Sequence, residues 1–224
     1  YIPSCNDLGV AQERQKKKTE SLANYLKACQ GQYAMACSNY AFVVEKDGKK
    51  AEAQTYYELG CQYGDAQSCN TRGVLAHDAK DLDTALKYYL KACDEMNLAL
   101  SCANLGNVYR ERKDEAKEKE YNRKACKMDD INGCYNEALN LYFSGKVAEA
   151  KPVFEKACKM DNSEACYNLA CVYAKSKDTK QALKYLEKSL KMGLADLNLV
   201  ETDEDLKDLR QLDQFKKLLK KYKK

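Results

Sequence analysis

The chain has 224 residues, of which 32% are charged, and a formal net charge of +4. So small and dispersed a positive charge excludes a dedicated nucleic-acid-binding surface, and no apolar run approaches the ~20 residues that span a bilayer. Helix-forming residues dominate and only two prolines and ten glycines interrupt them, which favours an all-α fold.

Cysteines recur in pairs every 32 or 33 residues. The spacing within a pair is C-x7-C, with one additional residue in the third pair. A sustained period of this length is typical of a repeat array, in which each unit buries its apolar face only against its neighbours. The pairs are Cys29 with Cys37, Cys61 with Cys69, Cys93 with Cys102, Cys126 with Cys134, and Cys158 with Cys166.

The array is predicted to start at an A helix, the first helix of a two-helix hairpin, with Cys5-Asn-Asp-Leu-Gly9. The residues before Cys5 contain neither a basic start nor the apolar stretch of a signal peptide. By analogy with the pairs, the partner of Cys5 would lie eight residues upstream. We therefore expect residues to have been removed ahead of this chain.

Six hairpins of an A helix and a B helix are predicted within residues 1–193. Each A helix opens with Cys-x-Asn-x-small, and each B helix ends, in its fullest form, with Ala-x-x-Tyr-Tyr-x-x-Ala-Cys. The B pattern gives one apolar stripe, which Glu118 interrupts, and the small residue of the A pattern favours close approach of the neighbouring helix. The predicted hairpins are 5–29, 37–61, 69–93, 102–126, 134–158 and 166–190.

Capping helices are predicted for residues 194–224. Leu190 and Asn198 stand where the next cysteine pair would fall, so the clamped repeats end there. A terminal repeat needs a polar outer face, which this segment provides; contact of its lysine-rich last turn with an anionic membrane is the alternative. Its apolar residues are Leu206, Leu209, Leu212, Phe215, Leu218 and Leu219.

Regularly paired cysteines favour a disulfide framework in an oxidising compartment, either the periplasm or the cell exterior. Each pair spans the turn from a B helix to the next A helix, so a disulfide there would clamp consecutive hairpins. Reduced buried thiols are the alternative. A metal site is disfavoured because zinc sites need closer cysteines or histidines, and no cofactor is expected. Two cysteines stay unpaired: Cys5, and Cys171, which lies in an apolar column without a basic neighbour and is expected to be a buried, inert thiol.

At Cys-x-Asn-x-small and Tyr-Tyr-x-x-Ala-Cys the chain resembles the Sel1-like repeat family. With its C-x7-C pairs it is most similar to the Helicobacter cysteine-rich proteins, which are secreted or periplasmic. It lacks the Gly-x-Gly-Val extension of Sel1-like loops, and the ending DLKDLRQLDQFKKLL resembles C-terminal segments of tetratricopeptide proteins. The resemblance implies a right-handed αα-repeat solenoid that binds a protein on its concave face.

An Asn of the A helix can bind an extended peptide backbone in these families. The matching residues are Asn39, Asn104, Asn136 and Asn168, and Asp7 and Thr71 hold the same place in the other copies. An amide offers the donor and the acceptor that a backbone requires. An Asn near a helix start can equally serve local backbone groups, so both interpretations stay open.

The expected function is that of an exported, monomeric interaction scaffold with a protein or peptide partner. A secreted effector that engages host surfaces and a mitochondrial intermembrane-space assembly factor are alternatives. Some relatives of the Helicobacter family are described as penicillin-binding β-lactamases, which need Ser-x-x-Lys; none of the nine serines here has that motif. His77 and Asp78 are adjacent on one helix and point apart, so His77 is expected to be a surface residue. No catalytic residue is predicted.

Overall fold

Helical hairpins followed by a C-terminal helical segment form the computed structural model, which describes residues 2–194 and 197–222. This confirms the predicted all-α repeat fold. The chain divides into two units, Tyr1–Asp114 and Glu115–Lys224, each of which is described by itself. None of the described helices is long and apolar enough to cross a membrane.

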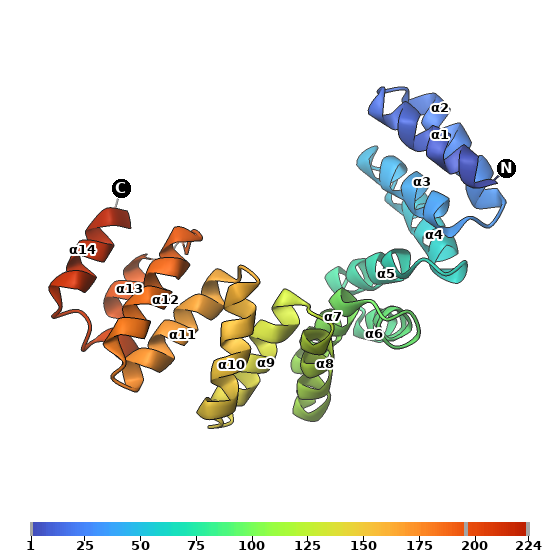
Figure 1. Ribbon diagram of the computed structural model, residues 1–224. Helices are drawn as coiled ribbons and strands as arrows, with labels where there is room; N and C mark the ends of the chain where they lie inside the picture. Colours follow the sequence, from blue (N-terminus) through green and yellow to red (C-terminus); the bar gives the residue numbers. More distant parts are fainter. Residues whose placement is uncertain (1, 195–196, 223–224) are drawn as a thin grey trace. The chain divides into compact units, whose positions relative to one another are not determined.

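The first unit contains three hairpins and one further A helix (Figure 1). Within it α1 packs on α2, α3 on α4 and α5 on α6, and each hairpin contacts the next. Its elements are α1 (Ile2–Arg14), α2 (Lys18–Gln30), α3 (Ala34–Lys46), α4 (Lys50–Gln62), α5 (Ala66–Asp78), α6 (Leu82–Leu90) with a π turn (Lys91–Glu95), and α7 (Ala99–Glu111).

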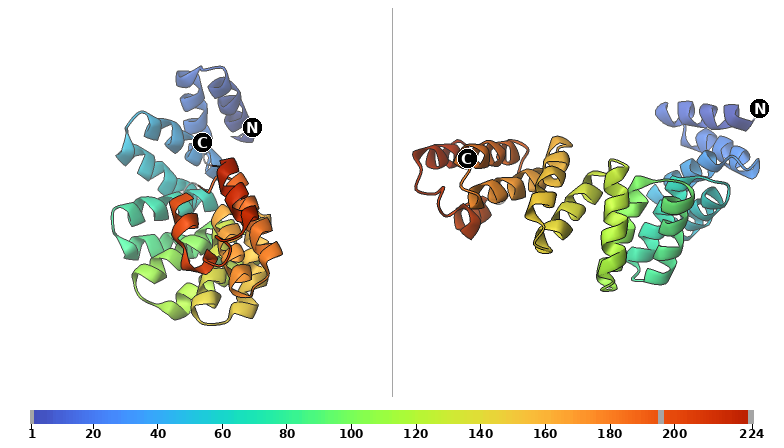
Figure 2. Two further views of the ribbon diagram at one scale, coloured as in Figure 1. Left: turned by 90° about the vertical axis from the view of Figure 1, so that its left-hand side faces the viewer. Right: turned by 60° about the horizontal axis from the view of Figure 1, so that its bottom comes forward.

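The second unit begins with a B helix and ends in the C-terminal cap. Within it α9 pairs with α10 and α11 with α12, and Figure 2 gives two further views of these hairpins. Its elements are α8 (Glu115–Lys127), α9 (Ile131–Phe143), α10 (Val147–Lys159), α11 (Ser163–Lys175), α12 (Thr179–Lys191), α13 (Leu197–Thr202), a 3₁₀ turn η2 (Glu204–Leu206) and α14 (Asp213–Tyr222).

The turns between repeat helices each contain one residue with positive φ. This left-handed conformation commonly terminates a helix. Glycine, which adopts it without strain, fills four of these places. Longer side chains occupy the other places. The glycines are Gly48, Gly64, Gly145 and Gly193, and the others are Lys16, Gln32, Lys80, Asn97, Lys113, Asp129, Asp161 and Lys177.

In two hairpins of the first unit, a glycine of the A helix accommodates a ring from the B helix of the same hairpin. A Cβ added to Gly73 would lie 2.5 Å from Cδ1 of Tyr89, and one added to Gly9 would lie 2.7 Å from Cδ1 of Tyr25. Both tyrosines are buried, with exposed fractions of 1% and 0%. The predicted close approach is therefore an approach of a buried ring to the helix backbone.

The five predicted disulfides are all present, with Cα–Cα distances between 4.2 and 5.0 Å. In the four C-x7-C pairs the first cysteine is the penultimate residue of a B helix and the second is the fourth residue of the next A helix. In the third pair, the π turn Lys91–Glu95 accommodates the additional residue. Cys93 and Cys102 thereby keep the bonding geometry of the other pairs.

Helix α8 departs from the other B helices in its core residues. Glu118 stands where most copies have Ala and is only 8% exposed. Asn122 takes the place that Phe154 holds in α10, and it is fully buried. Neither polar atom of the Asn122 amide has a hydrogen-bond partner among the described residues. This helix therefore has a locally polar core.

The C-terminal segment extends the core of the second unit, as a cap would. Val200, Leu206, Leu209, Phe215 and Leu219 are buried in the same cluster as the side chains of α11 and α12. Leu212 and Leu218 pack against that cluster and are partly buried. The division into an array at 1–193 and a cap at 194–224 stays a prediction.

Candidate functional site

The four predicted peptide-binding asparagines lie on the A helices α3, α7, α9 and α11. Asn39, Asn104 and Asn168 bind the preceding repeat. Nδ2 of Asn39 donates to Oδ1 of Asn6 at 2.9 Å, and Nδ2 of Asn104 donates to Oδ1 of Asn70 at 3.0 Å. We call this series of A-helix side chains the asparagine row.

In the second unit Nδ2 of Asn168 donates to the hydroxyl of Tyr135 at 3.3 Å. Asn136 is 8% exposed, whereas Asn39, Asn104 and Asn168 are half-buried. Each of these three amides therefore connects two repeats and still reaches the surface.

The acceptors of the asparagine row were missed in the sequence. They are the residues directly after the cysteine, such as Asn6 and Asn70, and each lies about one repeat before its donor. Asn70 also accepts a hydrogen bond from Oγ of Ser101 at 2.9 Å. One signal could have found them. It is a polar residue directly after the cysteine of one A helix, together with an Asn two residues after the cysteine of the next A helix.

A second repeated contact joins consecutive B helices through lysine. Nζ of Lys91 donates to the carbonyl of Cys61 at 3.2 Å, and Nζ of Lys156 donates to the carbonyl of Cys126 at 2.7 Å. Lys188 binds the carbonyl of Cys158 in the same way, at 2.7 Å. These carbonyls lie at helix C-termini, where a cation compensates the helix dipole.

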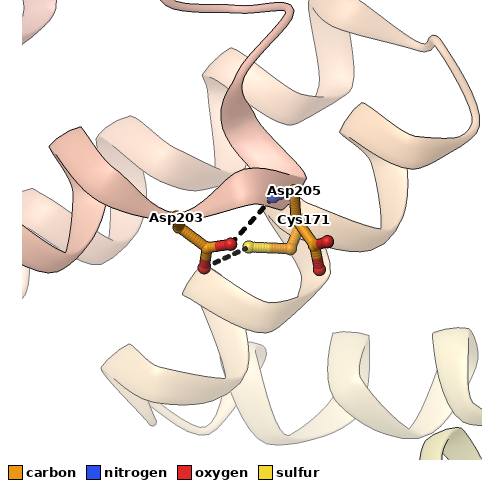
Figure 3. Close-up of side chains that lie close together, drawn as sticks. All are labelled: Cys171, Asp203 and Asp205. Carbon is orange, nitrogen blue, oxygen red and sulfur yellow. Dashed lines mark hydrogen bonds between the residues drawn. The ribbon is translucent and has the colours of Figure 1, made fainter.

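The free thiol of Cys171 faces two carboxylates of the cap (Figure 3). Its Sγ donates to Oδ2 of Asp203 at 3.8 Å, and the hydroxyl of Tyr167 donates to the same oxygen at 2.6 Å. Oδ1 of Asp203 accepts from the backbone N–H of Asp205 at 2.9 Å. Lys175 forms an ion pair with Asp205 at 2.9 Å.

This cluster has the spacing of a metal-ligand set, because the sulfur and the carboxylate oxygens of Asp203 and Asp205 lie within 4.8 Å of one another. Burial, and then the charges of Asp203 and Asp205, raise the pKa of Cys171 to about 12. A thiol with this pKa stays protonated at neutral pH and is therefore a poor nucleophile, because the nucleophile is the thiolate. We interpret the cluster as a latch, a set of hydrogen bonds that joins α11 to the cap.

The other residues considered in the sequence also have defined places. Cys5 is a half-buried free thiol on α1, packed beside the Cys29–Cys37 cluster. His77 is partly buried, with 23% of its side chain exposed, and its Nε2 lies 2.7 Å from Oε1 of Glu111. The imidazole therefore contacts the next A helix.

An apolar hollow of about 770 Å³ lies beside the turn between α9 and α10. Tyr142, Phe143, Val147 and Val172 line it, with Lys151 at its edge. Phe143 is 80% exposed, the most exposed of the described large apolar side chains. An apolar side chain of a partner could enter this hollow.

Comparison with known proteins identifies the repeats. Sequence models of the tetratricopeptide repeat match residues 66–95, 99–132 and 131–164, and a second such model matches residues 163–193. Cytochrome c oxidase assembly factor 7A of Xenopus laevis is 39% identical over 84 residues, which span 33% of this chain and 36% of that protein. The chain thus matches about a third of that relative's length.

Two solved structures share the fold. The protective antigen c5321 of uropathogenic Escherichia coli superposes with a TM-score of 0.73 at 18% identity, over 99% of this chain and 61% of that one. A Sel1 repeat protein of Oxalobacter formigenes gives 0.72 at 16% identity, over 85% and 88%. The matched tetratricopeptide repeats cover more than half of the chain. It therefore belongs to the tetratricopeptide repeat proteins.

Proposed function

We propose that this protein is an exported, monomeric interaction scaffold whose A-helix asparagines bind an extended segment of a partner protein. Family membership supports a protein-binding role, because such arrays bind proteins through extended repeat surfaces. The observation that carries the proposal is the row itself. It is a series of half-exposed amides, each held by the preceding repeat.

The hydrogen bonds within the row support binding. One N–H of Asn39 is used by Asn6, which fixes the orientation of the amide before a partner arrives. An oriented amide loses little conformational freedom on binding, and its carbonyl can accept from a peptide N–H. One Asn side chain can therefore bind the preceding repeat through its N–H and a peptide through its carbonyl.

The test is to capture partners from a native extract, identify them by mass spectrometry and measure the binding of the purified partner by calorimetry. Asn39→Ala and Asn168→Ala should each weaken binding about fivefold, the effect of one hydrogen bond. Thr71→Asn should strengthen it, because this half-exposed residue replaces Asn in the row and binds only its own helix. Asn132→Ala, at an exposed A-helix position outside the row, is the control. Unchanged affinity in all row variants would reject the assigned face.

The disulfides favour an oxidising compartment, and we propose the periplasm or the cell exterior. A mitochondrial intermembrane-space assembly factor is the second candidate, favoured by the match to cytochrome c oxidase assembly factor 7A. The native sequence upstream of Tyr1 discriminates between them, because a secretory signal peptide supports export and a different leader supports the second candidate.

We propose no catalytic role. We also propose that the protein is related to the Helicobacter cysteine-rich proteins. No Ser-x-x-Lys motif exists for a β-lactamase, and Cys171, the buried free thiol, is held protonated. Hydrolysis of a chromogenic β-lactam by the purified protein, abolished by a point substitution in this chain, would refute the absence of catalysis.

A further inference from the structure

A lysine-lined groove runs along the cap between α12 and α14. It consists of two adjoining hollows of about 830 and 480 Å³, which share Lys184, Glu187 and Lys221 in their walls. Because these walls are common to both hollows, we treat them as one groove, the cap groove. Its lysines are Lys180, Lys184, Lys188, Lys191, Lys217 and Lys221.

The six lysines that line the cap groove outnumber its two carboxylates, Asp161 and Glu187, and Lys184 also interacts electrostatically with Glu155. Lys221 pairs with Glu187 at 2.8 Å, and Lys188 donates to a backbone carbonyl. The other four lysines are exposed, and none of them forms an ion pair with a described carboxylate. A concave surface that gathers like charges raises the local potential and attracts an anionic partner.

Apolar side chains that are less exposed than most of its lysines also line the cap groove, and we call them its floor. Leu183 and Met192 from α12, and Leu218 and Tyr222 from α14, line it and are half-buried. Lysines along the walls and apolar side chains on the floor fit a segment that alternates carboxylates with apolar residues. A purely ionic ligand would leave this floor uncovered.

A membrane surface fits the cap groove less well than a peptide. An amphipathic helix binds a bilayer by burying its apolar face in it. The apolar residues Phe215 and Leu219 of α14 are only 2% and 6% exposed, because they pack on the core of the second unit. The helix therefore retains its lysines but has no free apolar face to insert.

We propose that the cap groove binds an acidic peptide segment of a partner protein, with apolar anchors between its carboxylates. The site shares no residue with the asparagine row and does not depend on it. Attraction between the exposed lysines and carboxylates provides orientation and speeds association, and the apolar floor provides contact area.

The test uses a fluorescein-labelled peptide made of Glu-Leu-Asp-Glu repeats, and fluorescence anisotropy with the full chain. Saturable binding is expected, weakening as salt rises. Lys184→Glu together with Lys217→Glu should reduce affinity about tenfold or more. Lys50→Glu with Lys113→Glu makes the same change in net charge at exposed positions of the first unit, and should change affinity much less.

Two further probes separate the alternatives. A peptide with Gly in place of Leu should bind more weakly, and Asn39→Ala should leave binding unchanged, which distinguishes this site from the asparagine row. Equal weakening by both charge-reversal pairs, or no binding of the Leu-containing peptide at low salt, would overturn the proposal. So would binding confined to vesicles of equal parts phosphatidylserine and phosphatidylcholine, because it would assign the cap groove to a membrane.

Discussion

Asn122→Leu should stabilise the protein, although it removes a polar side chain from a helix. The residue is fully buried and neither atom of its amide is paired with a described residue. Leaving an amide in this state costs about 1–3 kcal/mol, and burying a leucine side chain contributes about 1.5–3 kcal/mol. Leucine has the same branching as asparagine, and Leu186 holds the equivalent place in α12, where it is fully buried. Because the space is shaped for the smaller side chain, we expect a net gain of about 2–3 kcal/mol.

The gain is measured by thermal melting of the disulfide-intact protein, followed by far-ultraviolet circular dichroism. In a chain of this size it corresponds to a rise in Tm of roughly 5–10 °C. Asn132→Leu on α9 is the matched control, because Asn132 is exposed and its stability change should stay within about 0.5 kcal/mol. An unchanged or lowered Tm for Asn122→Leu alone would refute the reasoning, since it would mean that the amide is satisfied in solution.

Three further substitutions or measurements test other parts of the structure. Gly48 has φ 78° and open space around its Cα, so Gly48→Ala should destabilise the protein by about 1 kcal/mol through backbone strain alone. Lys80 has φ 63° in the equivalent turn, so Lys80→Gly should stabilise the protein by up to about 1 kcal/mol. Chemical denaturation measures both changes. Ellman's reagent should modify Cys5 in the native protein and Cys171 only after unfolding, because Cys171 is buried and its pKa is raised to about 12. Fast modification of two thiols in the native state would contradict the latch. Burial and a hydrogen bond to a carboxylate raise the pKa of Tyr40 to about 12, above its ordinary value of about 10, so its stabilising effect is complete below that ordinary value and is lost as pH rises toward 12. Tyr40→Phe should therefore flatten the alkaline part of the pH–stability curve, as measured by urea denaturation across that range.

The hairpins and disulfides could be predicted because each repeat carries the same information. The cysteine pairs mark the end of a B helix and the start of an A helix, and the turns at Gly48 and Gly145 contain the residues that a three-residue turn favours. Even the additional residue before Cys102 is absorbed locally, in a π turn. Periodicity therefore identified every repeat helix, and the helices extend one to three residues beyond the predicted bounds.

The contacts between repeats could not be predicted, because they depend on which side chains face each other about one period apart. Asn39 was considered for a partner peptide, and its contact with Asn6 requires the stacking of α3 on α1. The exception at Glu118 was recognised in the sequence, whereas the buried Asn122 one turn later was not. The latch of Cys171 depends on Asp203, which belongs to a segment without repeat pattern.

Three different kinds of contact join consecutive hairpins, and they are not equivalent. Between the last two hairpins, the Cys158–Cys166 disulfide joins α10 to α11, Lys188 joins α12 to α10, and Asn168 joins α11 to α9. A disulfide alone lets one hairpin rotate relative to the next about the linked helix ends. One hydrogen bond joins the two B helices and the other joins the two A helices, so together they oppose that rotation.

The hydrogen bonds also contribute to the free energy of unfolding. The disulfide contributes about 2–3 kcal/mol by the loop-entropy estimate, and each hydrogen bond about 0.5–1.5 kcal/mol, so the two together approach the disulfide. Elsewhere one of these contacts is missing. Leu59 replaces the lysine of α4, and Thr71 of α5 binds its own helix in place of the preceding repeat. Other side chains replace the missing contacts at these junctions. Lys18 pairs with Asp47 across the junction that the Cys29–Cys37 disulfide clamps, and Ser38 binds Asp65 and Ser68 of the next repeat beside the Cys61–Cys69 disulfide.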